Sequence, residues 1–591
     1  MKDFIKYVLA TVVGLLLFFI VIGIIGAMSI VGMIASGNAT TNVSDNSVLV
    51  LNLSGTMEEQ AGSNYMDMLY GTGINSLGLS ETLSAIKKAK DNDKIKGIYI
   101  EAGMFSADFA SIQEVRDALV DFKKSGKWIV AYGDTYTQGT YYLASVADKL
   151  WLNPQGEIDW HGLCANPYFI KDLLAKFGVK FQIVKVGKYK SATEMYTEDK
   201  MSDFNRAQTE AYVNGIWSNI CKAVSESRKI SVEKLNEYAD SLLTFSDQKE
   251  LINKKMADGL LYHDQVKAEV KKLLKLDDDK QINQVSINDM KNVKEKDKGE
   301  QIAVYYAYGS IVETEEEGLL LGDSHQIVDK KICKDFEKLM NDDNVKAVVI
   351  RVNSPGGSAY ASEQIWHQIE LLKAKKPVVV SMGGYAASGG YYMSCNSNWI
   401  VAEPTTLTGS IGIFGQIPDF SQLVTQKLGV KFDEVKTNKN SAFGTISRPM
   451  SAEEISYLQK YIDRGYSLFR KRVADGRKMT IDQVEAVAQG HVFLGQDAIK
   501  LKLVDELGGI DKAITKAASL AKLSEYHTTY YPDVPDFLEQ LLEQTEKGSG
   551  SYLDSKLRAT LGDFYEPYIM LKTLNKQSAI QARLPFFPNI H

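Results

Sequence analysis

The strongest constraint on the fold of this chain is an internal repeat with an offset of about 250 residues. Residues 91–100 (DNDKIKGIYI) resemble residues 341–350 (NDDNVKAVVI), and residues 177–181 (FGVKF) resemble residues 428–432 (LGVKF). The offset drifts by only a residue or two over more than 130 residues, which loop insertions and deletions explain and chance similarity does not. Self-similarity over this length predicts one fold that is used twice.

The repeat also predicts how the 591 residues are organised. A polar, Lys- and Glu-rich segment (KNVKEKDKGE) lies between the two copies and is typical of a solvated linker. The last segment of the chain has no counterpart in the first copy, and its sequence points to no function. The expected parts are an anchor at 1–40, a first domain at 46–290, a linker at 291–300, a second domain at 301–545 and a tail at 546–591.

Each copy alternates short apolar segments with amphipathic ones. Residues 302–307, 347–352 and 378–381 are short and β-branched, which is typical of buried strands. Residues 362–373 carry one apolar helical face, and residues 454–473 are typical of a long helix. Strands that alternate with helices predict an α/β fold whose strands are covered on both faces.

An uncharged apolar run extends from Tyr7 to Ala35. The run has 29 residues, whereas a helix that crosses a bilayer needs about 20. Lys2 and Lys6 precede the run and the next charge is Asp45, so the basic end is expected to stay in the cytoplasm. The run therefore predicts a single-pass anchor in the inner (cytoplasmic) membrane, with the remaining chain outside the cytoplasm.

A cleaved signal peptide is the alternative interpretation of this apolar run. Such peptides have an apolar core of about 7–15 residues, which is much shorter than the run observed. The segment Ile34-Ala35-Ser36-Gly37 is only a weak candidate for a cleavage site. An uncleaved anchor is the favoured interpretation, and no second run of this quality follows.

Composition excludes several classes of protein. The net charge is −6, so no basic field indicates a nucleic-acid partner. The seven His form no HExxH motif, and we therefore expect neither a metal nor a cofactor. The four Cys are widely spaced, which argues against a zinc site or a disulfide framework, and they stand at positions 164, 221, 333 and 395.

The second copy carries a glycine pair directly after a predicted strand. Residues 351–358 read RVNSPGGS, and Gly356 and Gly357 would let backbone N–H groups turn toward a ligand, as an oxyanion hole requires. A simple strand-to-helix turn is the alternative. The first copy has EAGMFS at 101–106 and lacks the double glycine.

Ser388 lies between small residues, after a predicted strand and before an apparent helix. This position suits a nucleophile, because small neighbours admit a substrate backbone and a helix N-terminus favours developing negative charge. It equally suits an N-cap, which is a common role of serine. The counterpart in the first copy is Gln138, which is no nucleophile.

A serine nucleophile needs a base, and no His is well placed. Lys190 is the alternative, and its position in the second copy falls on Asn440 or Ser441. The copy that keeps the serine lacks this lysine, and the copy that keeps the lysine lacks the serine. This complementary loss predicts one composite site built from both copies.

The chain after the apolar run resembles the signal peptide peptidase SppA family in its long two-domain form. The resemblance covers nearly the whole chain and includes several glycine-rich motifs. These motifs are YKSA at 189–192, NSPGG at 353–357, AASGGY at 386–391, TGSIGIFG at 408–415, GHVFLG at 490–495 and LVDELGG at 503–509.

The resemblance implies two tandem Clp-protease/crotonase-like domains and a Ser/Lys dyad. It makes Ser388 the nucleophile, Lys190 the general base and Ser410 a second serine that helps to hold the lysine. A turn residue is the alternative for Ser410, whose counterpart in the first copy is Trp160. It also implies apolar signal-peptide remnants as substrates, a membrane location and a homotetramer.

A lysine base requires a strongly lowered pKa, because a free lysine amine has a pKa of about 10.4. Burial or nearby cations can lower it, and Lys185 and Lys188 are the local cations. The neutral amine would take the serine proton, backbone N–H groups near Gly356 or Gly357 would hold the oxyanion, and an acyl-enzyme would follow.

Two other classes of protein remain open. A crotonase-like enzyme acting on acyl thioesters would have paired carboxylates and a cytosolic location, and the apolar run argues against it. A membrane-anchored scaffold or pseudoenzyme would not need to keep Lys190, Ser388 and the glycine pair.

Overall fold

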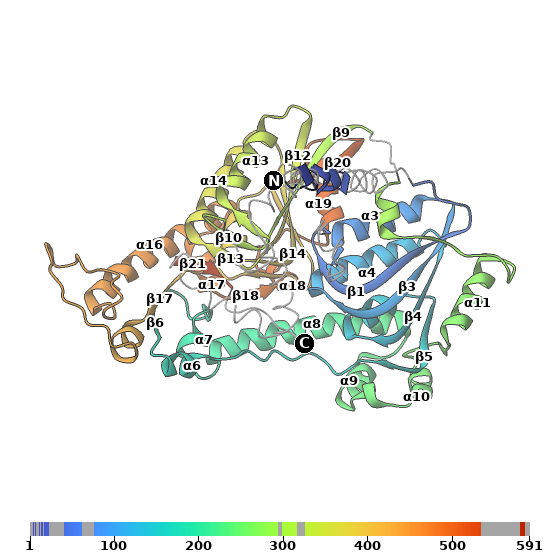
Figure 1. Ribbon diagram of the computed structural model, residues 1–591, viewed down its shortest axis with the longest axis horizontal. Helices are drawn as coiled ribbons and strands as arrows, with labels where there is room; N and C mark the ends of the chain where they lie inside the picture. Colours follow the sequence, from blue (N-terminus) through green and yellow to red (C-terminus); the bar gives the residue numbers. More distant parts are fainter. Residues whose placement is uncertain are drawn as a thin grey trace.

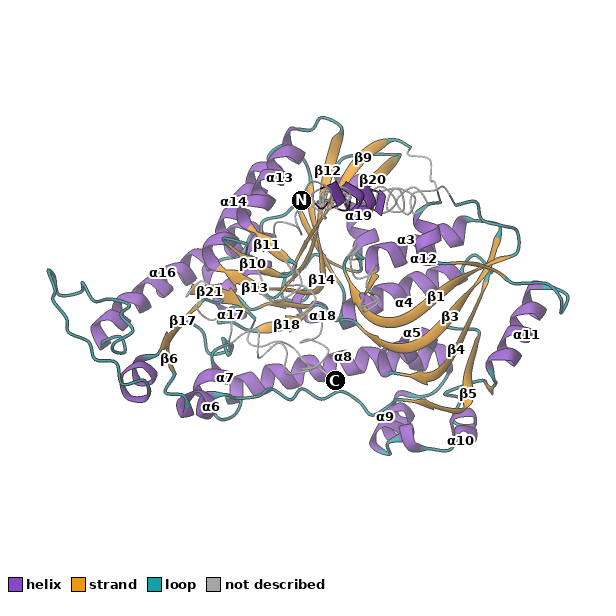
Figure 2. Cartoon of the chain, in the orientation of Figure 1, coloured by secondary structure: helices purple, strands orange, loops and turns teal. Residues whose placement is uncertain are grey.

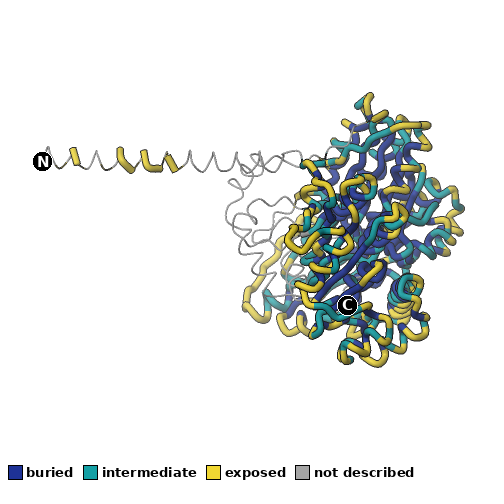
Figure 3. Tube along the Cα trace, turned by 90° about the vertical axis from the view of Figure 1, so that its right-hand side faces the viewer, coloured by how far each residue is buried: buried dark blue, intermediate teal, exposed yellow. Residues whose placement is uncertain are grey.

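The computed structural model describes residues 41–61, 76–293, 298–315, 325–532 and 580–584, together with isolated positions between Phe4 and Ile22. The isolated positions are helical and exposed (Figure 3). The rest of the predicted anchor lies outside the described residues. Within the described part of the chain, no helix combines the length and apolarity needed to cross a bilayer.

The first half is built around a parallel sheet, with helices on its two faces (Figures 1 and 2). The strand order is β2-β1-β3-β4-β5-β7, and β8 also pairs with β1. The strands are β1 (Ser47–Glu58), β2 (Ser76–Gly78), β3 (Ile95–Ser106), β4 (Trp128–Tyr136), β5 (Lys149–Ile158), β7 (Gly259–Leu260) and β8 (Asn283–Val285). The helices are α3 (Leu79–Asp91), α4 (Phe109–Lys123), α5 (Gln138–Ala144), α6 (Lys171–Lys176), α7 (Glu194–Thr197), α8 (Asp203–Arg228), α9 (Val232–Asp240), α10 (Gln248–Asn253), α11 (His263–Leu274) and α12 (Ile287–Lys291), with a 3₁₀ turn at Leu243–Phe245.

The second half repeats this arrangement around a sheet of order β18-β16-β14-β12-β9-β20, with β15 beside β14 and β19 beside β15. The predicted strands and helices of this half lie inside β9, β12, β14, α14 and α16. The strands are β9 (Glu300–Tyr308), β12 (Val345–Ser354), β14 (Val378–Ala387), β15 (Trp399–Ala402), β16 (Leu407–Gly409), β18 (Val492–Leu494), β19 (Glu506–Leu507) and β20 (Tyr526–Tyr531). The helices are α13 (Asp329–Asn341), α14 (Ala359–Lys373), α15 (Gly389–Ser394), α16 (Ala452–Arg477), α17 (Ile481–Val487), α18 (Gly495–Ala498) and α19 (Ile510–Leu520), with a π-helical turn at Leu423–Lys427.

A third sheet joins the two halves and the tail. Its order is β11-β10-β13-β21-β17-β6. Strand β6 belongs to the first half and β21 to the tail, whereas the other four come from the second half. The strands are β6 (Lys180–Lys185), β10 (Ser310–Val312), β11 (Gln326–Val328), β13 (Gly356–Ser358), β17 (Phe414–Asp419) and β21 (Ile580–Arg583).

The long helices α8 and α16 are equivalent in the repeat. Each has 26 residues, begins after a serine that caps the helix and ends at a lysine in the left-handed conformation. Helix α8 extends from the first half beneath the second (Figure 1). There, Asn219 donates a hydrogen bond from Nδ2 to Oε1 of Gln496 at 3.1 Å. The first apolar core accordingly contains Val492 and Leu494 of the second half.

A buried ion-pair network also connects the halves. Arg351 of β12 donates from Nε to Oε2 of Glu59 at 2.9 Å and from Nη1 to a carboxylate oxygen of Glu114. Asn353 donates from Nδ2 to Oε1 of Glu59 at 2.8 Å. Burial raises the pKa of Glu59, and it raises the pKa of Glu114 to about 7, although the Arg351 charge opposes both shifts. The two buried carboxylates of Glu59 and Glu114 therefore depend on the positive charge of Arg351.

Replacing this arginine should destabilise the whole protein. In Arg351→Ala, the carboxylates of Glu59 and Glu114 stay buried without their cation, and such a loss costs about 3–5 kcal/mol of unfolding free energy. Denaturant unfolding measures the loss. The control is Lys90→Ala, which removes a partly exposed pair with Asp121 and should cost about 1 kcal/mol or less. Equal stability of the two variants would contradict a role for the network in joining the halves.

Candidate active site

Ser388 occupies the sharp turn between β14 and α15. Its backbone angles are φ 55° and ψ −111°, a conformation that is strained for a residue with a side chain. Two hydrogen bonds hold the turn, from the Ser388 N–H to the Gly409 carbonyl at 2.8 Å and from the Tyr392 N–H to the Ser388 carbonyl at 2.7 Å. The turn thus fixes the direction of the Ser388 side chain.

The Ser388 hydroxyl does not cap α15. It is buried and hydrogen-bonded to the Lys190 amine, with 2.8 Å between Oγ and Nζ. Of the two roles that the sequence left open for this serine, the geometry excludes the side-chain cap. The residue meets instead the lysine predicted from the other half.

Lys190 lies in the loop between β6 and α7, and it is fully buried against the second half. Tyr189 beside it donates its N–H to the Gln489 carbonyl at 3.0 Å and stacks on the His491 ring with centroids 4.0 Å apart. Gly490 has φ +78°, and a Cβ there would lie 2.7 Å from the Lys190 Cβ. The second half therefore encloses the lysine stem, and the enclosure needs glycine at position 490.

Gln208 of α8 is a functional candidate that the sequence did not reveal. It is buried, and its Nε2 donates to the Tyr189 carbonyl at 3.2 Å and to the Ser191 hydroxyl at 3.1 Å. Its Oε1 accepts the N–H of Val492 at 3.2 Å. One amide thus ties the lysine loop to β18. No motif marks it, because a lone glutamine on a helix carries no local signal.

The Lys190 amine has three polar neighbours. Besides Ser388, they are the hydroxyl of Ser410 at 3.0 Å and the carbonyl of Ser410 at 3.1 Å. Ser410 has φ 52°, and its N–H donates to the His491 carbonyl at 2.7 Å. The predicted second serine therefore holds the amine with two of its own atoms.

Burial lowers the pKa of the Lys190 amine well below its ordinary value, because a buried cation loses its hydration. The nearby cations do not contribute to this shift, contrary to the sequence-based expectation. The Lys185 amine donates to the Lys190 carbonyl at 3.4 Å, and the Lys188 amine lies 5.0 Å from the centre of the Phe204 ring. Desolvation alone favours the neutral amine.

The glycine pair lies beside the serine. A Cβ on Gly356, whose φ is +100°, would lie 2.8 Å from the N of Gly389, the residue that follows Ser388. A Cβ on Gly357 would lie 2.0 Å from the Ile311 carbonyl oxygen. The Gly356 N–H donates to the Ser354 hydroxyl at 3.1 Å. Both positions therefore require glycine, and the predicted oxyanion segment stands next to the serine turn.

The equivalent place in the first half is closed by structural contacts. Gln138 accepts the N–H groups of His161 and Gly162 at 3.0 and 2.9 Å, and its Nε2 donates to the Gly162 carbonyl at 2.8 Å. Trp160, the counterpart of Ser410, is buried and donates from Nε1 to the Leu235 carbonyl at 2.9 Å. These side chains stabilise the first half and offer no nucleophile.

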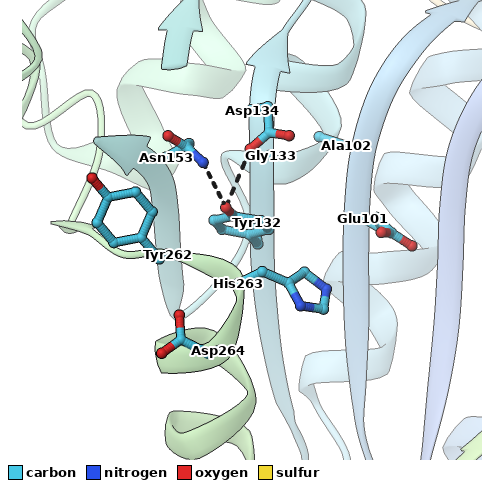
Figure 4. A pocket seen from close by; sticks show the side chains of 9 residues that line it. All are labelled: Glu101, Ala102, Tyr132, Gly133, Asp134, Asn153, Tyr262, His263 and Asp264. Carbon is cyan, nitrogen blue, oxygen red and sulfur yellow. Dashed lines mark hydrogen bonds between the residues drawn. The ribbon is translucent and has the colours of Figure 1, made fainter. Parts of the chain in front are cut away.

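A separate hollow opens in the first half near β4, β5 and α11 (Figure 4). Within it, Asn153 donates to the Tyr132 hydroxyl and that hydroxyl donates to Asp134, both at 3.2 Å. The hollow contains no Ser, Thr, Cys or Lys, so it does not compete with Ser388 as a nucleophile site. Its lining residues are Glu101, Ala102, Tyr132, Gly133, Asp134, Asn153, Tyr262, His263 and Asp264.

Comparison with known families defines the class of the protein. Residues 300–399 match the Clp protease family, and residues 121–277 and 370–524 match Peptidase family S49. The two S49 segments fall one in each half of the repeat. The class is therefore that of serine peptidases with a Clp-protease-like α/β fold.

The chain belongs to Peptidase family S49, as a member of the signal peptide peptidase SppA family in its long two-domain form. It is 37% identical to Protease 4 of Salmonella typhi, over 92% of this chain and 89% of that protein. Identity to Protease 4 of Haemophilus influenzae is 32%, over 89% and 88% of the two chains. Identity to the chloroplastic serine protease SPPA of Arabidopsis thaliana is 31%, over 81% and 69%.

Crowding the lysine stem should disable the enzyme. In Gly490→Ala, the new Cβ would stand 2.7 Å from the Lys190 Cβ, so the amine must move away from Ser388. We expect peptide hydrolysis to fall about 100-fold, because a displacement of about 1 Å within an active site costs that much. The control is Gly444→Ala, which has a similar φ of +76° but open space around the Cβ. An equal loss of kcat in both variants would contradict the role assigned to the enclosure.

Proposed function

We propose that the protein is a membrane-anchored serine endopeptidase that uses Ser388 as nucleophile and Lys190 as general base. The observation that carries this proposal is the 2.8 Å contact between a buried amine and a serine hydroxyl at a strained turn. Family S49 membership supports the reaction class. The two partners come from different halves, in agreement with the complementary loss in the repeat.

The chemistry follows from the protonation state of the lysine. Neutral Lys190 accepts the Ser388 proton while Oγ attacks the scissile carbonyl carbon. The Gly357 N–H stabilises the oxyanion, since the Gly356 N–H already donates to the Ser354 hydroxyl. The protonated lysine then gives its proton to the leaving amine, and water hydrolyses the acyl-enzyme. Ser410 keeps the Lys190 amine within hydrogen-bonding distance of the Ser388 hydroxyl by accepting two hydrogen bonds from it.

The proposed substrates are remnant signal peptides and similar apolar peptides left in the membrane after secretion. Support comes from membership of the signal peptide peptidase SppA family and from the apolar run between Tyr7 and Ala35. Such an anchor would keep the site beside that pool, with the catalytic part on the extracytoplasmic side of the inner membrane. A homotetramer is the assembly that the family resemblance implies.

Removal of either dyad residue tests the mechanism. Ser388→Ala and Lys190→Ala should each lower kcat/KM on an apolar fluorogenic peptide by about 1,000-fold or more, because nucleophile and base act as one unit. Ser397→Ala is a matched control, since Ser397 is a buried serine of the same half that bonds only to backbone carbonyls. A serine-directed phosphonate should label Ser388 in the wild type. Wild-type hydrolysis by both dyad variants would refute the mechanism.

The pH profile tests the lysine separately. Because only the neutral amine accepts a proton, kcat/KM should fall as the pH drops through the lowered pKa of Lys190. The optimum is therefore expected on the neutral to alkaline side. Initial rates measured from pH 5 to 10 on one uncharged peptide ester provide the profile. An optimum at acid pH would exclude a lysine base.

A further inference from the structure

The tail returns to the candidate site as a strand. β21 lies between β13, which holds the glycine pair, and β17, which begins four residues after Ser410. It is antiparallel to both, with Ala582 opposite Gly357 and Gln581 opposite Phe414. β21 fills the place between β13 and β17 (Figure 1), where each of these two strands would otherwise have an unpaired edge.

The Ala582 carbonyl points into the site. Its oxygen is 2.1 Å from the place where a Gly356 Cβ would be and 3.0 Å from the place where a Gly389 Cβ would be. It therefore lies between the glycine pair and the residue that follows Ser388. Ala582 itself is completely buried.

The register of β21 directs this carbonyl to an N–H group. The Leu584 N–H donates to the Pro355 carbonyl at 2.7 Å. Hydrogen-bonded pairs alternate along antiparallel strands, so the next such pair is Ala582 with Gly357. The Gly357 N–H therefore faces the Ala582 carbonyl. This is the geometry that an oxyanion donor and an acyl carbonyl need.

Apolar contacts hold the strand at both ends. Leu584 is buried in the core that belongs mainly to the first half. Ile580 packs against the core of the second half. The backbone of β21 thus pairs with two neighbouring strands, and its end residues pack against the cores of both halves. An extended peptide that is bound by strand addition makes the same kinds of contact.

We propose that residues 580–584 are a built-in competitor for the peptide substrate, with Ala582 in the position of the residue whose carbonyl is attacked. The proposal rests on the function proposed above and adds a regulatory element to the same site. Because the tail is part of the same chain, its binding is intramolecular, so weak intrinsic binding is enough to fill the site. Peptides must displace it, and the buried Ala582 indicates that a small side chain fits this position.

Shortening the chain tests the competition. A chain that ends at residue 579 should have a KM for an apolar peptide about tenfold or more below that of the full chain, with kcat little changed. In the full chain the peptide binds only the fraction of molecules whose site is not occupied by the tail, and this raises the apparent KM. The synthetic peptide SAIQARLPFF, which spans residues 578–587, should inhibit the shortened chain competitively. The same peptide with Trp in place of the alanine at 582 should not inhibit it.

A second variant keeps this test independent of catalysis. Ser388→Ala in the shortened chain should still bind the peptide SAIQARLPFF in calorimetry, and the full-length Ser388→Ala protein should bind it much more weakly. If the shortened chain with Ser388 intact binds the peptide but hydrolyses no substrate, the proposed function is overturned, whereas occupancy of the site by the tail is supported. The proposal that the tail competes with substrate would be overturned if the KM did not change on shortening and if the shortened and full-length proteins bound the peptide equally or not at all. A single cooperative unfolding transition of the shortened chain, well above the assay temperature, excludes misfolding as the cause.

Discussion

The burial of one amine organises this structure. Among the residues that the structure describes, no carboxylate pairs with the Lys190 amine, and burial lowers its pKa. That condition exists only where the second half covers the lysine loop, with glycine at position 490 against the lysine stem and Ser388 and Ser410 around the amine. A lysine left in water would keep its proton and could not act as the base proposed for this site. The proposed chemistry therefore depends on the contact between the halves.

The two copies of the fold contribute different residues to the candidate site. The first half supplies the lysine and has turned its equivalent of the serine site into a structural turn, where Gln138 and Trp160 bond to backbone groups. The second half supplies the serine, the glycine pair and the enclosure. Helix α8, the Arg351 network and the shared third sheet keep the two in register. A pair of loosely linked domains would not hold an amine and a hydroxyl at hydrogen-bonding distance.

Much of the fold was predictable from local patterns. The buried strands inside β9, β12 and β14 are short β-branched runs, and the long helix α16 begins with a capping box at Ser451. The meeting of Lys190 with Ser388 and Ser410 was predicted from the sequence, but the cause of the lowered lysine pKa was not. Lys185 and Lys188 adjoin Lys190 in sequence, yet they do not lower its pKa, because their amines point to a backbone carbonyl and an aromatic ring. The sequence did not reveal Gln208, since its role depends on contacts with the distant lysine loop and with strand β18.

The sequence by itself determined the repeat and the α/β class, because these follow from periodicity and from the alternation of strands and helices. It predicted one composite site from the complementary loss, and the family resemblance assigned Ser388 and Lys190 to it. Only the tertiary structure decided that Lys190 and Ser388, which are 198 positions apart in the sequence, are in contact and that the lysine amine is buried from solvent. It alone decided the place of the tail, since the short segment IQAR has no pattern that distinguishes a strand from a loop. Pairing partners and burial are properties of the folded chain, and local sequence does not encode them.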